Sequence, residues 1–341
     1  MASPGQGKTR GQAGYGEGRA EIRAGDDVLF DEEAMVAELL ACLEAPDYRP
    51  PTLPAVAVEL MSMSTRADVA IEDVVRLLER DSLIAGRVLK QAGSAALGAA
   101  VKITSLREAT MRLGLLRIRD LVMEIAMNLR VFKSDAYGDA MERIRRHAVA
   151  TAHAARLVCK YTPIEGEFAF MAGLLHDVGI AGTLLALSER KSKGGRRVAP
   201  PDLLVIWPAV DRVHARAGEI MARHWQLPAD IRLAITLHHQ VLLDGHPHPL
   251  AATVAVANEL SHAGGAGLVP RSDEKEAGDE EPEDAIEAVG TEDWLSAHTN
   301  VDRSSEATLA RARDALGIDA RQSGLIEVEA RGLFERLASE A

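Results

Sequence analysis

A histidine and an aspartate, His176 and Asp177, stand side by side in the apolar, glycine-bracketed run GLLHDVGIAG of residues 173–182. Burying an imidazole and a carboxylate without polar partners costs several kcal/mol. The pair therefore predicts partners that satisfy it, either protein hydrogen bonds or a bound metal ion. Neutral imidazole and carboxylate together form a ligand set that suits Fe, Mn, Zn or Ni.

Other polar side chains of the same kind occur on further stretches with helical periodicity. His147, for example, falls on the same predicted stripe as Ile144 and Ala148. A lone histidine on an apolar helix face is usually a hydrogen-bonded core residue, but five predicted helices that each direct a polar side chain inward favour one shared site, metallated or vestigial. The candidate ligands of that site are His147, His176, Asp177, His214, His238, His239 and Asn258.

Composition and periodicity predict the helices that must carry these residues. Of 341 residues, 47% are hydrophobic but only 4% are aromatic, so the core must be aliphatic, and segments with the alternating pattern of strands are scarce. Apolar residues recur every three to four positions in one set of segments from about 55 to 131 and in a second from about 140 to 263. We therefore expect a nearly all-α protein.

Charge and cysteine content narrow the function classes. Ten acidic residues and one lysine lie between Asp273 and Glu292, so this segment carries −9 of the net charge of −12, and the nearly neutral remainder offers no broad basic surface for nucleic acid. Two distant cysteines argue against a disulfide framework. The sequence contains no run of about 18 apolar residues, so it predicts no membrane span. We expect a cytoplasmic protein without membrane or nucleic-acid partners.

The order of the polar residues carries a family resemblance. The chain resembles the HD superfamily of metal-dependent phosphohydrolases in the succession of His147, His176–Asp177, His214, His238–His239 and a polar residue at 258. Its upstream segments PPTLPAVAVELMSMS, LLERDSLIAGRVLKQAGSAALG and ITSLREATMRLGLLRIRDLVM resemble the N-terminal half of the HDOD family, the HD-related output domain of bacterial signalling proteins. The resemblance covers roughly residues 50–263.

The resemblance implies an all-α HDOD domain with two helical lobes, at about 50–135 and 140–263. His262 and His298 flank the linker that follows and have no predicted role in the site. The predicted order along the chain is a disordered tail (1–27), a short helix and linker (31–49), the HDOD domain (50–263), an acidic flexible linker (264–303) and C-terminal helices (304–341), whose packing on the domain is left open.

The resemblance also implies roles for the candidate ligands. His147, His176, Asp177 and position 258 would hold one divalent metal ion, Fe, Mn or another, and His214, His238 and His239 would hold a second ion or contact phosphate. Two positions depart from the pattern of active relatives. Those enzymes have aspartate where this chain has Asn258, and the branch that hydrolyses cyclic dinucleotides has a lysine where it has Ile180 and a G-Y-P signature that it lacks.

These departures favour a regulatory protein of the HDOD type over an enzyme. We expect the chain to act through other signalling proteins or by sensing a ligand, with a degenerate metal site and no catalysis; a homo-oligomer is left open. The alternative is a metal-dependent phosphohydrolase that acts on a nucleotide or cyclic dinucleotide. Arg146, Arg196 and Arg197 are candidate phosphate contacts, although solvated surface positions explain them at least as well.

Overall fold

The computed structural model describes residues 31–93, 103–190, 195–196, 198–268 and 305–340. Regular structure in these residues is helical, apart from one short antiparallel hairpin in which β1 (Leu242–Leu243) pairs with β2 (His246–Pro247). The prediction of an all-α protein is therefore confirmed. The predicted disordered tail of residues 1–27 and most of the predicted acidic linker of 264–303 lie outside the described residues.

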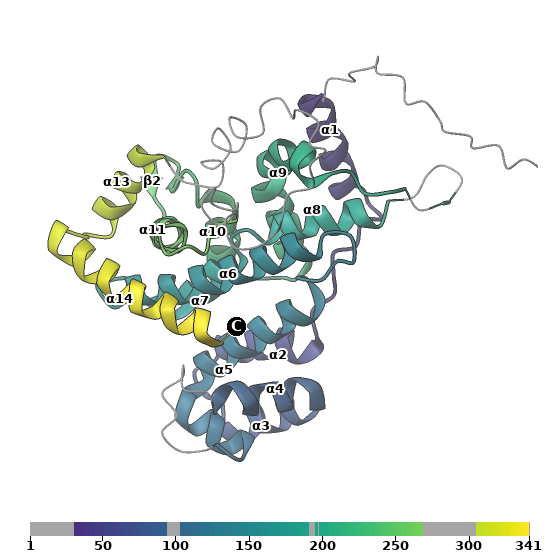
Figure 1. Cartoon of the computed structure of the whole chain (residues 1–341). Coiled ribbons are helices and arrows are strands. Elements are labelled where there is room, and N and C mark those ends of the chain that lie inside the picture. The colour runs from purple at the N-terminus through teal and green to yellow at the C-terminus, as the bar shows by residue number, and fades with distance from the viewer. Residues whose placement is uncertain (1–30, 94–102, 191–194, 197, 269–304, 341) are drawn as a thin grey trace, which may run out of the picture. The chain divides into compact units, whose positions relative to one another are not determined.

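One group of helices packs around α5 (Figure 1). Its members are α2 (Ala55–Ser64), α3 (Ile71–Glu79), α4 (Ser82–Ala92) and α5 (Leu106–Arg130). The Asp81 carboxylate caps α4 by accepting hydrogen bonds from the backbone N–H groups of Leu83 and Ile84 at 3.1 and 3.0 Å, which satisfies two donors that the helix leaves open. Within α5, Gly114 has a φ of 76° and interrupts the helix in a conformation that glycine tolerates best.

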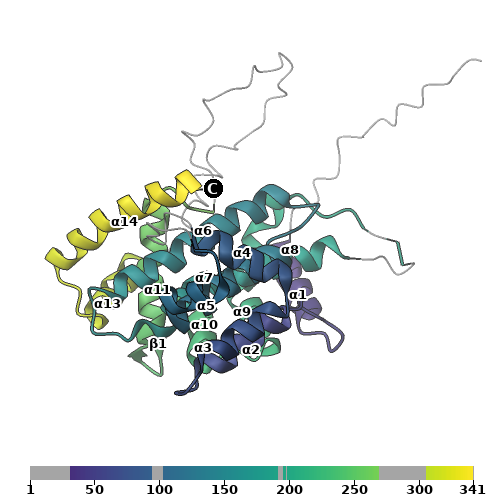
Figure 2. The ribbon, with the colours of Figure 1, turned by 90° about the horizontal axis from the view of Figure 1, so that it is seen from below.

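A second group of helices carries the histidines (Figures 1 and 2). Its members are α6 (Gly138–Cys159), the 3₁₀ helix η2 (Gly166–Phe168), α7 (Ala169–Leu175), α8 (Val178–Ser188), α9 (Leu203–His224), α10 (Ala229–Leu237) and α11 (Pro249–Ala263). α7 contacts α6, α10 and α11, and it also contacts α5 of the first group. α8 packs on α9, and α9 packs on α10. A single aliphatic cluster of buried side chains runs through both groups.

A buried ionic network lies where α5 meets the second group. Arg119 of α5 is 1% exposed and donates to the Asp120 carboxylate at 2.8 and 3.0 Å and to the backbone carbonyl of Glu167. Arg156 of α6 donates to the other Asp120 oxygen, and its guanidinium lies 4.4 Å from the ring centroid of Phe170 in α7. Because each buried charge has a partner, the network fixes the position of α5 relative to α6 and α7.

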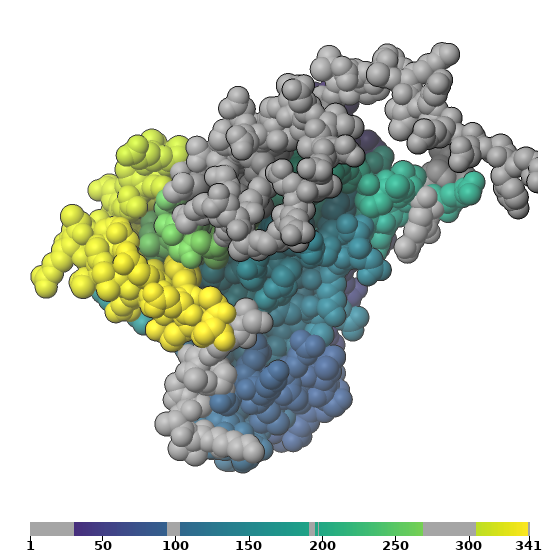
Figure 3. Space-filling model, in the orientation of Figure 1, coloured from purple at the N-terminus to yellow at the C-terminus, as the bar shows by residue number. Residues whose placement is uncertain are grey.

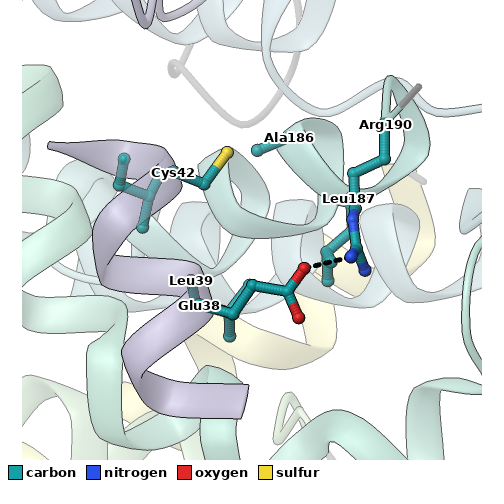
Figure 4. A pocket seen from close by; sticks show the side chains of 7 residues that line it. Glu38, Leu39, Cys42, Ala186, Leu187 and Arg190 are labelled. Carbon is teal, nitrogen blue, oxygen red and sulfur yellow. Dashed lines mark hydrogen bonds and ion pairs between the residues drawn. The ribbon is translucent and has the colours of Figure 1, made fainter. Parts of the chain in front are cut away.

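α1 (Glu32–Leu43) packs on α8 and α9. Leu39 and Leu43 are its buried side chains, while solvent-exposed ion pairs such as Glu33–Arg212, at 2.7 Å, add little stability. A small pocket opens between α1 and α8 (Figure 4). It is lined by Glu38, Leu39, Cys42, Leu43, Ala186, Leu187 and Arg190. None of these residues is a candidate ligand, so the pocket is separate from the histidine site.

α13 (Glu306–Ala315) and α14 (Ala320–Glu340) pack on the second group (Figures 1 and 2). α13 contacts α11, and α14 contacts both α6 and α11. Leu316, at the end of α13, and Ile326 of α14 share a cluster with buried side chains of α6 and α11. Ala330 and Phe334, further along α14, belong to a second such cluster. The C-terminal helices therefore extend the core of the histidine-bearing group.

Among the described residues, one stretch, Gly166–Ser188, has the length and apolar composition of a membrane-spanning helix. The apolar window of this stretch is 89% buried inside the protein. It comprises η2, α7 and α8, and therefore includes His176 and Asp177. Its apolar character belongs to the core that surrounds the site.

Candidate metal centre

His176 and Asp177 lie at the break between two helices. α7 ends at Leu175 and α8 begins at Val178, so His176 is the C-cap of one helix and Asp177 the N-cap of the next. Successive residues of an α-helix point about 100° apart, and an unbroken helix would direct the two side chains into different surroundings. The break instead brings Nε2 of His176 to 3.1 Å from Oδ2 of Asp177, with both side chains fully buried.

His238 and His239 are placed in the same way at the end of α10. The helix ends at Leu237 and His238 is its C-cap, and the two ring centroids lie 4.0 Å apart. The prediction that every candidate ligand lies within a helix is therefore wrong for the His176–Asp177 and His238–His239 pairs. It holds for His147 in α6 and His214 in α9. The physical reason is that adjacent side chains converge only where the rotation of the helix stops.

Two glycines bring the helices of the site into close contact. A Cβ added at Gly179 of α8 would lie 1.9 Å from the backbone oxygen of His214 in α9. A Cβ added at Gly173 of α7 would lie 2.7 Å from the backbone oxygen of Thr151 in α6. Any side chain at either position would force the two backbones apart, so both glycines are needed to draw ligand-bearing helices together.

Backbone carbonyls fix the protonation of four histidine rings. The Nδ1–H groups donate as follows: His147 to Ala266 at 2.8 Å, His176 to Gly173 at 2.8 Å, His214 to Asp211, and His238 to Ile235 at 2.7 Å. A carbonyl oxygen can only accept a hydrogen bond, so Nδ1 carries the proton in each ring and Nε2 keeps its lone pair. Metal-binding histidines are held in this way by the groups around them.

The four Nε2 atoms converge on the Asp177 carboxylate. Oδ2 lies 3.1 Å from Nε2 of His176 and 3.6 Å from Nε2 of His147. Oδ1 lies 3.4 Å from Nε2 of His238 and 3.5 Å from Nε2 of His214. Neither oxygen accepts a hydrogen bond from the described part of the chain. A buried carboxylate without donors is unfavourable, and a bound cation would satisfy it.

Ring nitrogens also face one another at short distances. Nε2 of His147 lies 3.2 Å from Nε2 of His176, and Nε2 of His214 lies 3.1 Å from Nε2 of His239. In the first pair the proton of each ring is on Nδ1, so two lone pairs meet with no proton between them. A cation bound by both nitrogens removes this repulsion.

The donor atoms form two sets that share Asp177, and within each set all atoms lie within 4.8 Å of one another. The first set is His147, His176 and Asp177; the second is Asp177, His214, His238 and His239. Imidazole and carboxylate donors of this kind fit a divalent transition metal. The orphaned carboxylate and the converging lone pairs show that these residues fit a metal ion as they are arranged.

Burial favours the neutral form of three of the rings. It lowers the pKa of His147 to about 3, an effect to which neighbouring His176 adds, and it lowers the pKa values of His214 and His239. At neutral pH these three uncharged rings cannot balance the charge of the Asp177 carboxylate, and a bound cation would.

Asn258 and His262 lie one turn apart on α11. Asn258 is 1% exposed, on a helix that packs against α6 and α7, and its role as a ligand stays a prediction. His262 was expected to lie outside the site, which is wrong, because its ring centroid lies 4.9 Å from that of His147. The four-residue spacing from Asn258 places both residues on one helix face, and this spacing is the signal that could have revealed His262.

Two of the three predicted phosphate contacts lie at the surface. Arg146 and Arg196 have exposed side chains, and Arg197 lies outside the described residues. Ile180 is 0% exposed and belongs to the aliphatic core, so the position that is a lysine in cyclic-dinucleotide hydrolases faces the protein interior. The role of the arginines in binding phosphate stays a prediction.

His153 of α6 predicts how acid weakens the fold. Its ring lies against Phe170, with the centroids 5.2 Å apart, and burial lowers its pKa to about 4, with a further contribution from Arg117. Its contribution to stability is complete above the unfolded pKa of about 6.5 and is lost as the pH falls towards 4, because only the unfolded chain binds the proton in that range. The maximum slope is about 1.4 kcal/mol per pH unit.

We therefore expect His153→Leu to unfold with a shallower dependence on pH than the wild type. Urea unfolding between about pH 7 and pH 5 measures this difference. The two proteins share every other titratable group, so the comparison isolates one proton. Equal slopes for the two proteins would show that His153 is protonated in the folded state.

The fold and the site define a class of protein, an all-helical protein with a buried histidine–aspartate centre suited to metal ions. The family model of the HDOD domain matches residues 51–241, more than half of the chain. The chain belongs to the HDOD family. α11, α13 and α14 follow the matched residues, so Asn258 and His262 lie beyond them.

Among curated proteins, the chain is similar to an uncharacterized protein from Treponema pallidum (strain Nichols). The two are 28% identical over 223 residues, which are 61% of this chain and 41% of the relative. The chain thus spans about two fifths of the length of that relative.

Two solved structures share the fold. An HDOD domain protein of unknown function from Geobacter sulfurreducens is 22% identical, with a TM-score of 0.59 over 90% of this chain and 99% of that one. A protein from Shewanella amazonensis SB2B, named as a candidate metal-dependent phosphohydrolase, is 18% identical, with a TM-score of 0.61 over 90% of this chain and 98% of that one. At these identities the likeness establishes the fold alone.

Proposed function

We propose that this chain is a metal-binding regulatory protein of the HDOD family, which acts on other signalling proteins in the cytoplasm and does not turn over a substrate. One observation carries the proposal: four rings donate Nδ1–H to backbone carbonyls and present unprotonated Nε2 atoms to a carboxylate that accepts no hydrogen bond from the described residues. This arrangement is suited to binding a cation and is energetically unfavourable without one.

The first ligand set would hold one divalent ion and the second set another, with Asp177 contributing one oxygen to each. Fe or Mn suits these mixed imidazole and carboxylate donors. Bound ions would supply rigidity, because His147, His176 and Asp177 would join α6 to the α7–α8 junction, while Asp177, His214, His238 and His239 would join that junction to α9 and to the end of α10. They would thereby give a partner protein a single helical arrangement to recognise.

Three features support regulation over catalysis. Asp177 is the sole carboxylate in the two ligand sets, so the charge available to hold two ions is low. Ile180 lies in the core, and Asn258 provides an uncharged amide where active relatives have a carboxylate. Phosphoryl transfer requires cationic groups or metal charge around the phosphate, and this chain has less of both.

A second candidate function, metal-dependent hydrolysis of a phosphoester, is favoured by the sharing of Asp177 between the sets. Enzymes that use two metals place them about 3.5–4 Å apart around a bridging ligand, where the ions activate water and polarise the phosphoryl oxygen. A nucleotide or a cyclic dinucleotide would be the substrate.

Metal analysis tests the proposal and separates it from the alternative. We expect full-length protein, purified anaerobically without chelator, to contain about two ions per chain, one for each ligand set, and to leave bis(p-nitrophenyl) phosphate intact. Bound metal together with hydrolysis that chelation abolishes would favour the phosphohydrolase. Protein that takes up neither Fe²⁺ nor Mn²⁺ would overturn both candidates and identify the centre as a hydrogen-bonded relic.

A further inference from the structure

The turn that follows α11 contacts both the metal centre and the C-terminal helix. It comprises residues 264–268, which were predicted to begin the flexible linker, yet Leu268 is buried in the core and the Ala266 carbonyl accepts the Nδ1–H of His147. We propose that Phe334 of α14 is a positioning residue for the ligand His147 and acts through this turn. The inference rests on the proposed function, since it concerns the first ligand set.

The backbone of the turn aims one carbonyl at His147. Gly264 is the C-cap of α11, Gly265 has a φ of 82°, and the N–H of Ala266 donates to the carbonyl of Ser261 at 2.9 Å. The left-handed conformation at Gly265 reverses the chain over the end of the helix, as in other glycine-terminated helices. The Ala266 carbonyl then points back to α6, at 2.8 Å from Nδ1 of His147.

Phe334 packs directly against the start of this turn. A Cβ added at Gly264 would lie 2.2 and 2.6 Å from Cδ2 and Cε2 of the Phe334 ring. The ring is 9% exposed and belongs to a cluster of buried side chains from α6, α7 and α11. α14 itself lies on the surface of the molecule (Figure 3). The buried ring therefore holds Gly264 in place from outside the HDOD match.

The ring of His262 also lies against His147. The two rings are inclined to each other by 48°, with the centroids 4.9 Å apart. A Cβ added at Gly267 would lie 2.9 Å from Nδ1 of His262, so the turn also fits closely around this ring. His147 thus contacts the Ala266 carbonyl, which the turn carries, and the His262 ring, around which the turn fits closely.

Removing the Phe334 ring would leave a cavity beside Gly264 and let the turn relax. Nδ1 of His147 would then lose the carbonyl that fixes its tautomer, and a share of the rings would carry the proton on Nε2, where they cannot bind metal. The second ligand set does not include His147. We therefore expect weaker binding of the ion held by the first ligand set and unchanged binding of the other ion.

The experiment compares Phe334→Ala with Ile326→Ala in the full chain. Both residues are buried on α14, but Ile326 belongs to a different cluster and supplies a control for loss of packing. Mn²⁺ binding to chelator-treated protein, followed by the electron paramagnetic resonance of free Mn²⁺, should show one site weakened about 10- to 100-fold in Phe334→Ala and both sites retained in Ile326→Ala. Equal weakening in the two variants would overturn the proposal.

A compensating substitution gives a second test. Gly264→Ala adds a Cβ where the Phe334 ring lies, at a residue whose φ of −81° alanine also adopts. This substitution should weaken Mn²⁺ binding at the first ligand set only. The double variant Gly264→Ala/Phe334→Ala should bind Mn²⁺ better than the sum of the two single losses of affinity predicts, because the added methyl group fills part of the cavity. Additive losses of affinity would show that the contact between Phe334 and Gly264 does not position His147.

The tautomer of His147 can be read without metal, which separates this inference from the metal-centre proposal. Nitrogen-15 NMR of histidine-labelled, metal-free protein should show a protonated Nδ1 for His147 in the wild type and in Ile326→Ala, and a mixture of tautomers in Phe334→Ala. An unchanged tautomer in Phe334→Ala would overturn the positioning role. Failure of the wild type to bind Mn²⁺ would overturn only the metal-centre proposal.

Discussion

Asp177→Asn is expected to abolish binding at both metal positions at once. Oδ2 of Asp177 lies 3.1 Å from Nε2 of His176, and Oδ1 lies 3.4 Å from Nε2 of His238, so one carboxylate serves both ligand sets. Asparagine keeps the shape but removes the charge and one of the two acceptor oxygens. Metal content, measured by mass spectrometry after purification without chelator, should fall from near stoichiometric to background.

The same substitution should have opposite effects on stability with and without metal. Ligand binding at 100 times its dissociation constant stabilises the folded state by about 2.7 kcal/mol per site, and Asp177→Asn loses this stabilisation at both sites. In chelated protein the variant should be at least as stable as the wild type, because it removes a buried charge that accepts no hydrogen bond from the described residues.

Asp211→Asn provides the matched control. Oδ1 of Asp211 lies 3.9 Å from Nδ1 of His214, on the side of the ring that faces away from Asp177, and Asp211 belongs to neither ligand set. This variant loses a carboxylate near the same histidine and should retain both ions. Metal retained by Asp177→Asn, or lost equally by both variants, would contradict the assignment of Asp177 as the shared ligand.

Much of the fold could be predicted because it depends on periodic patterns. Apolar residues at three- to four-residue intervals mark the helices, and the stripes that contain His147 and His214 place both rings inward from the α6 and α9 helices, as the structure shows. Polar residues within apolar segments indicate a site, because burying them without polar partners is costly. The same reasoning singled out His176 and Asp177.

The details that make the site suitable for metal could not be predicted. The partners of the Nδ1 atoms are backbone carbonyls, which every residue has, so no letter of the sequence identifies Ala266 as the partner of His147. The helix break at His176–Asp177 follows from tertiary packing, and the run around it is apolar apart from these two residues. His262 was missed because it was interpreted as a residue flanking the linker, whereas its place on α11 brings its ring centroid to 4.9 Å from that of His147.

Gly179→Ala is expected to be among the most damaging single substitutions in the chain. The added Cβ would lie 1.9 Å from the backbone oxygen of His214 and 2.5 Å from the backbone nitrogen of Gly218. Backbone atoms cannot rotate away as a side chain can, so α8 and α9 must separate. We expect a loss of about 3 kcal/mol or more from a total stability that is typically about 5–15 kcal/mol, measured by urea unfolding.

Separation of α8 from α9 should also impair the metal centre, because Asp177 begins one helix and His214 lies on the other. Gly179→Ala should therefore lose the second ion, held by His214, His238 and His239, more readily than the first. Metal analysis of whatever folded protein is recovered measures this effect. A folded variant with wild-type metal content would show that the helices can separate without disturbing the ligands.

Gly86→Ala is the control that distinguishes close packing from backbone flexibility. Gly86 lies in the middle of α4, and a Cβ there would meet no atom within 4 Å. Because alanine limits the unfolded chain more than glycine does, this substitution should stabilise the protein by about 0.5–1 kcal/mol. The same chemical change thus has opposite predicted signs at two helical glycines. If both substitutions stabilise the protein, the contact between α8 and α9 does not require a glycine at position 179.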